Sequence, residues 1–263
     1  MKRLFLVGTF FLWAGLAQGR SELTVCADPN NMPFSNQAGQ GFENKIVELI
    51  ARDMHVRLNY LWWAQRRGFV RNTLNASKCD LWPGVPAMLE RVAASVPYYR
   101  STYVFVSRAD RGLGHLTLDD EKLRKLTIGV QMIGNNASNT PPAHAIARRG
   151  LIENVRGYML YGNYAENNPT DEIVRSVEQG SIDVAIVWGP QAGYFAAQSR
   201  IPLRIENVLP SGEGPWPMSF DIAMGVRRGD AALLGEINAA LSRKREAIDD
   251  ILTAYHVPLL PVE

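Results

Sequence analysis

The 263-residue sequence is poor in the side chains that build metal and nucleophilic sites. It has two cysteines and four histidines, and no histidine has a carboxylate or cysteine at the spacing that metal ligands require. The histidines are His55, His115, His144 and His256. The sequence also has no glycine-rich phosphate loop after its first strand-like segment. We therefore expect neither a metal site nor a bound cofactor.

Long apolar runs are absent beyond the amino terminus. The chain begins with Lys2 and Arg3, continues as an apolar run, and ends this segment in the small-residue triplet Ala17-Gln18-Gly19. This pattern is typical of a secretory signal peptide, with a retained membrane anchor as the alternative. No later segment reaches the roughly 18 consecutive apolar residues of a spanning helix. We therefore expect a signal peptide over residues 1–19 and a mature chain that is exported to the periplasm without spanning the membrane.

An excess of charge of one sign is also missing from the expected mature chain. Removal of residues 1–19 takes away two of the 28 lysines and arginines and no acid, which leaves 26 basic against 26 acidic side chains. Nucleic-acid binding depends on clustered excess positive charge. The composition therefore argues against a nucleic-acid partner.

The two cysteines, Cys26 and Cys79, are an even number in a chain that we expect to be exported. Such cysteines usually pair as a structural disulfide. A redox or metal-binding pair is the alternative, but the sequence has no CxxC motif and no histidine near either cysteine. We predict a disulfide whose α-carbons lie within about 4.4–6.8 Å of each other.

Strand-like and helix-like segments alternate along the chain, as they do in parallel sheets with helices on both faces. The expected strands cover residues 21–25, 56–62, 80–84, 100–108, 126–130, 182–188 and 219–226. The expected helices cover 41–53, 68–76 and 171–180, and begin near 140, 231 and 248. The pattern restarts after a linker at 109–115, which indicates two similar α/β halves joined by two extended crossings.

The loop CADPNNMPFSN, residues 26–36, follows the first expected strand with an aspartate, asparagines and an aromatic ring. In open α/β sheets ligands bind beyond the carboxyl ends of the strands. The loop therefore predicts one wall of a binding cleft, with Asp28 and Phe34 facing the ligand.

Several blocks of the chain resemble the type 2 periplasmic solute-binding proteins. They are TVCADPNNMPFS, GFENKIVELIA, CDLWPGVP, PYYRSTYVFV and GSIDVAIVWGPQAGYF. The resemblance implies a two-lobed α/β fold in which each lobe is a mainly parallel sheet flanked by helices, with two crossover strands. We place lobe 1 at residues 22–105 and 221–263, and lobe 2 at 106–220.

Three blocks, RRGFVRNTLNASKCD, PYYRSTYVFV and WGPQAGYF, are more narrowly similar to the MoxJ/XoxJ branch of that family. Proteins of this branch are encoded with periplasmic dehydrogenases that oxidise alcohols such as methanol with pyrroloquinoline quinone (PQQ), and are needed for their activity. The branch therefore implies an accessory factor that binds or matures a PQQ-dependent alcohol (methanol) dehydrogenase, with a c-type cytochrome as a further partner. The alternative is the solute receptor of an ABC permease.

The sequence departs from the amino-acid receptors of the family at three positions. Trp188 stands where those receptors carry the aspartate that binds the substrate ammonium, and the turn at Gly84 lacks the usual threonine. Arg91 is displaced from the position of the carboxylate-binding arginine. An ammonium group without its acid would be desolvated and unpaired, which costs several kcal/mol. Any solute is therefore expected to be something other than a free amino acid.

Aromatic residues gather at the expected strand ends, where they would serve a flat ligand or a protein partner. Core packing is the alternative for all of them. We interpret Trp62 as core, and the cleft candidates are Phe34, Trp63, Trp82, Tyr98, Tyr99 and Trp188.

Polar candidates complete the predicted cleft. Arg66 and Arg67 form either a clamp for carboxylates or a solvated start of a helix. Asn136 and Ser138 precede a helix and either contact the ligand or only cap that helix. Asp28 and Glu166 are the acids that an enzyme would use, but neither has an identifiable partner. We therefore predict a binding protein rather than an enzyme.

Overall fold

The computed structural model describes residues 20–133, 139–159, 164–166, 168–209, 212–213 and 216–261. The expected signal peptide, Asn136 and Ser138 lie outside the described residues. Among the helices of the described part, none has the length and apolar character to cross a membrane.

Ten strands of the described chain form one continuous sheet in the order β4-β1-β5-β14-β7-β10-β8-β9, with β6 on β14 and β11 on β7. Its first half contains β1 (Glu22–Ala27), β4 (Arg57–Trp62), β5 (Leu81–Pro86) and β6 (Ala93–Ala94). Its second half contains β8 (Ile128–Met132), β9 (Val155–Met159), β10 (Val184–Trp188) and β11 (Leu203–Asn207). Two small hairpins, β2 (Asn30–Asn31) with β3 (Ser35–Asn36) and β12 (Gly212–Glu213) with β13 (Trp216–Pro217), lie off the sheet.

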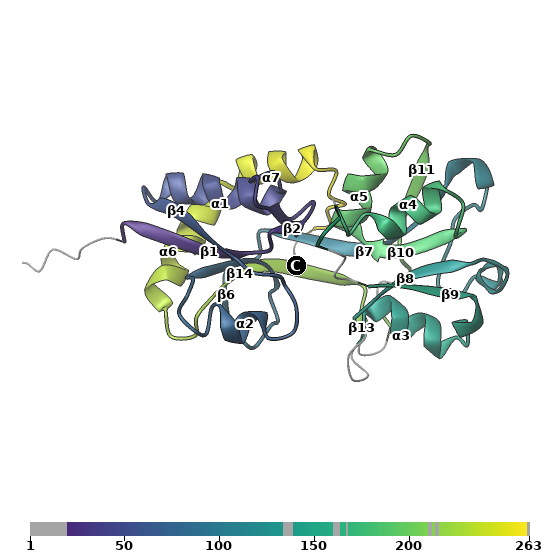
Figure 1. Cartoon of the computed structure of the whole chain (residues 1–263), viewed down its shortest axis with the longest axis horizontal. Coiled ribbons are helices and arrows are strands. Elements are labelled where there is room, and N and C mark those ends of the chain that lie inside the picture. The colour runs from purple at the N-terminus through teal and green to yellow at the C-terminus, as the bar shows by residue number, and fades with distance from the viewer. Residues whose placement is uncertain are drawn as a thin grey trace, which may run out of the picture.

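Two long strands, β7 (Tyr99–Arg108) and β14 (Ser219–Val226), join the halves. The amino-terminal part of β7 pairs with β14 in antiparallel orientation, and its carboxyl-terminal part pairs with β10 and β11. Figure 1 shows both strands running through the centre of the elongated molecule. The pairs β1–β4, β1–β5, β8–β9 and β8–β10 are parallel. Each half thus has a parallel core of three strands, β4-β1-β5 and β9-β8-β10, as predicted, but the pairs that β7 and β14 make with their neighbours are antiparallel, so the sheet is mixed.

Helices cover both faces of each half (Figure 1). In the first half these are α1 (Phe42–Asp53), α2 (Phe69–Asn72), α6 (Ala231–Arg243) and α7 (Arg245–Ala254). In the second half they are α3 (Pro141–Arg148), α4 (Glu172–Glu178) and α5 (Gly189–Ala197). Short 3-10 helices span Ala109–Arg111, Glu121–Lys125 and Ile152–Asn154. The apolar faces of α1, α6 and α7 bury one core with β1, and those of α3, α4 and α5 bury two more on the faces of the second half.

The helix predicted over residues 68–76 is much shorter in the structure. Only Phe69–Asn72 is helical, and turns follow. Gly68 has a left-handed backbone (φ +89°), and the Thr73 hydroxyl donates to the carbonyl of Phe69 at 2.7 Å. A side-chain bond of this kind competes with a regular helix, so the chain turns toward Cys79.

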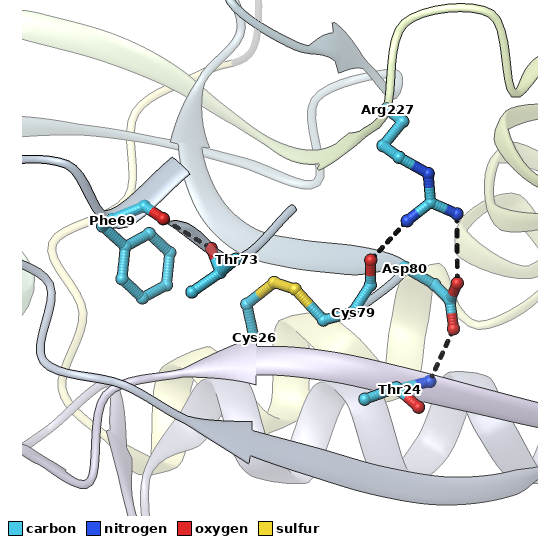
Figure 2. Close-up of a disulfide and its surroundings, with 7 residues drawn as sticks. All are labelled: Thr24, Cys26, Phe69, Thr73, Cys79, Asp80 and Arg227. Carbon is cyan, nitrogen blue, oxygen red and sulfur yellow. Dashed lines mark hydrogen bonds and ion pairs between the residues drawn. A yellow bond between two sulfur atoms is a disulfide. The ribbon is translucent and has the colours of Figure 1, made fainter. Parts of the chain in front are cut away.

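The predicted disulfide is confirmed: Cys26 is bonded to Cys79, with the α-carbons 5.6 Å apart. Figure 2 shows its surroundings. Arg227 donates to the carbonyl of Cys79 and to the Asp80 carboxylate, and that carboxylate also accepts the Thr24 amide at 3.0 Å. The disulfide therefore ties β1 to the start of β5, and Arg227 holds the same segment from the end of β14.

Candidate functional site

The loop after β1 is organised by the carboxylate of Asp28, which is only 1% exposed. One oxygen accepts the Asn30 amide at 2.9 Å and the other accepts the Gln65 amide at 2.7 Å. The carbonyl of Asp28 accepts the Ser35 hydroxyl at 2.8 Å. Asp28 therefore joins the first loop to the segment that follows β4, and its charge is satisfied by backbone amides rather than exposed to solvent.

Three residues of the same loop contact the second half, and we name the whole contact the interlobe clasp. It joins Asp28, Asn30 and Met32 of the first loop to Tyr164, Glu166 and Thr170 of the second half. The Tyr164 hydroxyl donates to Asp28, and the Asn30 side-chain amide donates to the carbonyl of Glu166 at 2.9 Å. The Thr170 hydroxyl donates to the carbonyl of Met32 at 2.8 Å. The two halves are thus hydrogen-bonded to each other at the predicted cleft.

Charge and packing reinforce the interlobe clasp. The Arg66 guanidinium lies 4.8 Å from the centre of the Tyr164 ring, a cation–π distance. Burial and the bond to Asp28 raise the pKa of Tyr164, which keeps the phenol protonated as a donor. The Met32 side chain is buried and belongs to the apolar cluster of the second half that also contains residues of β7, β10, α4 and α5. The first loop is therefore anchored in the other half by its own side chains.

Trp188 ends β10 and immediately precedes α5. Its half-buried ring packs edge-on against Tyr103 and Phe220, with ring centres 5.2 and 5.9 Å away. Its backbone amide donates to Gln131 at 3.3 Å, and Gln131 in turn donates to Gln191 at 2.5 Å. Trp188 thus belongs to an aromatic stack between the two halves, and it brings no charge to the cleft.

Tyr98 and Tyr99, predicted to line the cleft, lie in the core instead, with 1% and 2% of their surface exposed. Both pack beside Glu43 on α1, and the Tyr98 hydroxyl accepts the Gly84 amide at 3.1 Å. The sequence predicted that both tyrosines lie near the end of a strand that faces the cleft. In the structure β7 begins at Tyr99, and this part of the strand lies inside the first half. They present no surface to a ligand or partner in this conformation.

Glu43 is a buried carboxyl group that sequence reasoning missed, because a glutamate in the first turn of a helix is usually solvated. It is 4% exposed, and burial raises its pKa to about 8. Gly84 approaches it closely: a β-carbon on Gly84, which has φ +76°, would lie 2.0 Å from a Glu43 carboxyl oxygen. The left-handed backbone at Gly84 disfavours any side chain at this turn, and the nearby Glu43 carboxyl adds to that preference, so backbone conformation accounts for this glycine without a ligand.

The other predicted residues lie nearer the surface. Phe34 is half-buried against Phe42, with ring centres 5.3 Å apart. Trp63 is 39% exposed, and the Lys78 ammonium lies 5.4 Å from its ring centre. Trp82 packs on Phe69 at 5.1 Å and, together with Arg66 and Arg67, lines a hollow of about 490 Å³ beside α2. Tyr164, Thr170 and Gln191 lie far from the first loop in sequence and carried no local signal.

In the part of the chain that the structure describes, no group of three histidine, cysteine, aspartate or glutamate side chains could hold a metal ion. The two acids considered for catalysis, Asp28 and Glu166, take part in the interlobe clasp through different groups. The Asp28 carboxylate is bonded to amides and Tyr164, whereas Glu166 contributes its backbone carbonyl to the clasp. What the arrangement provides is a closed contact between two halves with an aromatic and basic hollow at its side.

Comparison with known proteins identifies the family. Residues 23–256 match the bacterial extracellular solute-binding proteins, family 3. The chain belongs to this family. A relative, the protein MoxJ of Methylorubrum extorquens, is 32% identical over 253 residues, which cover 91% of this chain and 82% of that protein.

Two crystal structures extend the similarity to the fold. The periplasmic binding protein XoxJ from Methylobacterium extorquens AM1 is 36% identical, with a TM-score of 0.76 over 91% of this chain and 100% of that chain. MxaJ from Methlophaga aminisulfidivorans MPT is 28% identical, with a TM-score of 0.78 over 90% of this chain and 100% of that chain. The family 3 chain therefore has the two-lobed type 2 periplasmic binding fold, as predicted.

Proposed function

We propose that this family 3 protein is a periplasmic accessory factor that binds or matures a PQQ-dependent alcohol (methanol) dehydrogenase. The observation that carries the proposal is the state of the cleft. The first loop is hydrogen-bonded to the second half by the interlobe clasp, and Trp188, which we align with the ammonium-binding aspartate of amino-acid receptors, packs against Tyr103 and offers no carboxylate. Similarity to MoxJ, XoxJ and MxaJ supports the same role.

In this proposal the protein acts by holding a partner rather than by a chemical step of its own. The export that we expect from residues 1–19 brings it to the compartment of the dehydrogenase. Surface aromatic and arginine side chains are the usual energetic anchors of protein interfaces. Trp63, Arg67 and Trp82 are the predicted site residues that meet this requirement, with Arg66 beside them. A c-type cytochrome that accepts electrons from the dehydrogenase is a further proposed partner.

Deleting the gene is expected to abolish most alcohol dehydrogenase activity in the periplasm, because the enzyme would lack its accessory factor. Periplasmic extracts would be assayed for dye-linked alcohol oxidation, and the amount of dehydrogenase measured by immunoblot. A plasmid copy of the wild-type gene should restore the activity. Normal activity in the deletion strain would contradict the accessory role and favour the receptor of an ABC transporter.

Free amino acids are expected not to bind, even at millimolar concentration. A bound ammonium would meet the Trp188 ring instead of a carboxylate, and a π face offers only about 1–2 kcal/mol to a cation. Arg91 lines two hollows in the described part of the chain, one of them beside α2, and Trp188 is not among the residues that line either of these two. Calorimetry with glycine, glutamine and lysine checks this, and Trp188→Asp should not restore binding. Micromolar affinity of the wild type for any of them would refute the expectation.

A further inference from the structure

Two hollows, one of them beside α2, share Arg91 and together form what we call the basic groove. The first, of about 490 Å³, runs along residues 65–71 and over Trp82, and the second, of about 540 Å³, has five lining residues. Those five are Asn75, Glu90, Arg91, Arg227 and Arg228. The lining contains six arginines and, among the described residues, a single acid, Glu90. The groove is therefore strongly positive in a chain whose overall charge is close to zero.

Most of this charge is available to an external anion. Arg67, Arg71, Arg91 and Arg228 are exposed, and no ion pair or side-chain hydrogen bond to them occurs within the described residues. Many arginines elsewhere are paired, for example Arg243 with Asp53 and Arg149 with Asp119. Like charges placed together without partners are unfavourable, so the gathering of four such arginines indicates a surface that meets negative charge.

The base of the basic groove is held by packing and by ion pairs. Phe69 and Trp82 pack on a buried cluster that contains the Cys26–Cys79 disulfide, Leu74 and Val85. Arg227 is held in place by Asp80 and Asp230, at 3.2 and 3.7 Å. A partner therefore meets an aromatic base on a buried cluster and one guanidinium group, that of Arg227, already held by ion pairs, and groups held in this way lose less freedom on binding.

We propose that the basic groove binds an acidic segment of a partner protein. Exposed single ion pairs are weak, so a small carboxylate gains little from any one of these arginines. A chain segment with several aspartates or glutamates can pair with arginines from both hollows at once and cover Trp82, and such complementarity gives specificity and fast association. This proposal rests on the proposed function for the identity of the partner, the alcohol dehydrogenase, but the charge match itself is independent of it.

The test compares Arg67→Glu/Arg91→Glu with the matched control Arg156→Glu/Arg200→Glu. The control arginines are exposed on the second half and have no side-chain partner in the described chain, so both variants change the net charge equally. The probe is a fluorescein-labelled peptide of ten glutamates, titrated by anisotropy at low and at physiological salt. We expect the groove variant to bind at least about tenfold more weakly than the wild type, and the control to change little. Thermal melting confirms that both variants are folded.

Other outcomes overturn the proposal. They are no peptide binding by the wild type, an equal loss in both variants, citrate competing as well as the peptide does, or a single-stranded oligonucleotide binding more tightly. Complementation of the deletion strain is a second readout, in which the groove variant should fail and the control should succeed. If the groove variant restores full activity, the groove is not the dehydrogenase surface. If deletion itself has no effect, the proposed function fails and the peptide titration still decides the groove.

Discussion

Glu43→Gln is expected to stabilise the protein far more at pH 8 than at pH 5. Burial raises the pKa of Glu43 from 4.5 to about 8. At a pH between these two pKa values, the Glu43 carboxyl group is ionised in the unfolded chain and protonated in the folded chain. Rising pH therefore favours the unfolded state. The free energy of unfolding of the wild type falls as the pH rises from 4.5 to 8, and this loss is complete above pH 8. Glutamine is neutral at every pH, so the variant escapes this loss.

The expected size follows from linkage at about 1.36 kcal/mol for each pH unit between the two pKa values. From pH 5 to pH 8 the free energy of unfolding of the wild type should fall by roughly 3–4 kcal/mol more than that of Glu43→Gln. Urea unfolding, followed by tryptophan fluorescence, gives the difference in free energy of unfolding between the variant and the wild type at pH 5 and at pH 8. The exposed Glu236→Gln on α6 serves as the control and should show no such pH dependence. A gain of equal size at pH 5 and pH 8 would show that Glu43 is not protonated in the folded state.

Loss of the disulfide should lower the free energy of unfolding by about 4 kcal/mol. The bond closes a loop with a sequence separation of 53, and without it the unfolded chain gains the conformational freedom of that loop. The double variant Cys26→Ala/Cys79→Ala would be compared with the wild type by urea unfolding, with and without a reducing agent.

A reducing agent should destabilise the wild type and leave the double variant unchanged, since the variant has no cysteine left to reduce. A difference below about 1 kcal/mol would mean that the loop is already restricted in the unfolded chain. Peptide binding by the double variant also shows whether the basic groove depends on the disulfide, because Phe69 and Trp82 pack on the cluster that contains this bond.

Much of the fold was predictable because its signals are local. The apolar face of residues 42–53, the β-branched run of 184–188 and the paired cysteines each indicate their own structure without reference to distant parts of the chain. Strands β9 and β11 were missed because both are largely accessible and show no regular alternation of buried and exposed positions. Helix α5, GPQAGYFAA, was missed because it follows β10 directly, with Trp188 at its N-cap position and no side-chain capping bond to mark its start.

The site was less predictable because its contacts are remote in sequence. Asp28 was expected to face a ligand, yet its partner Tyr164 lies 136 residues away and nothing near either residue indicates the pairing. Tyr98 and Tyr99 are aromatic residues of the kind that also line binding clefts, so the sequence does not show whether they are exposed. Their burial is evident only once β7 is paired with β14. The basic segment at 65–71 was recognised, but the contribution of Arg228 depends on β14 returning beside it.

The insertion of Met32 into the second half has a mechanical consequence. For the halves to separate, this side chain must leave a packed apolar environment for water, at a cost of about 1.5–3 kcal/mol. The bonds that Asn30 and Tyr164 make across the interface must break in the same movement. Opening of the interlobe clasp therefore carries a free-energy cost of its own, which adds to the cost of any movement of one half relative to the other.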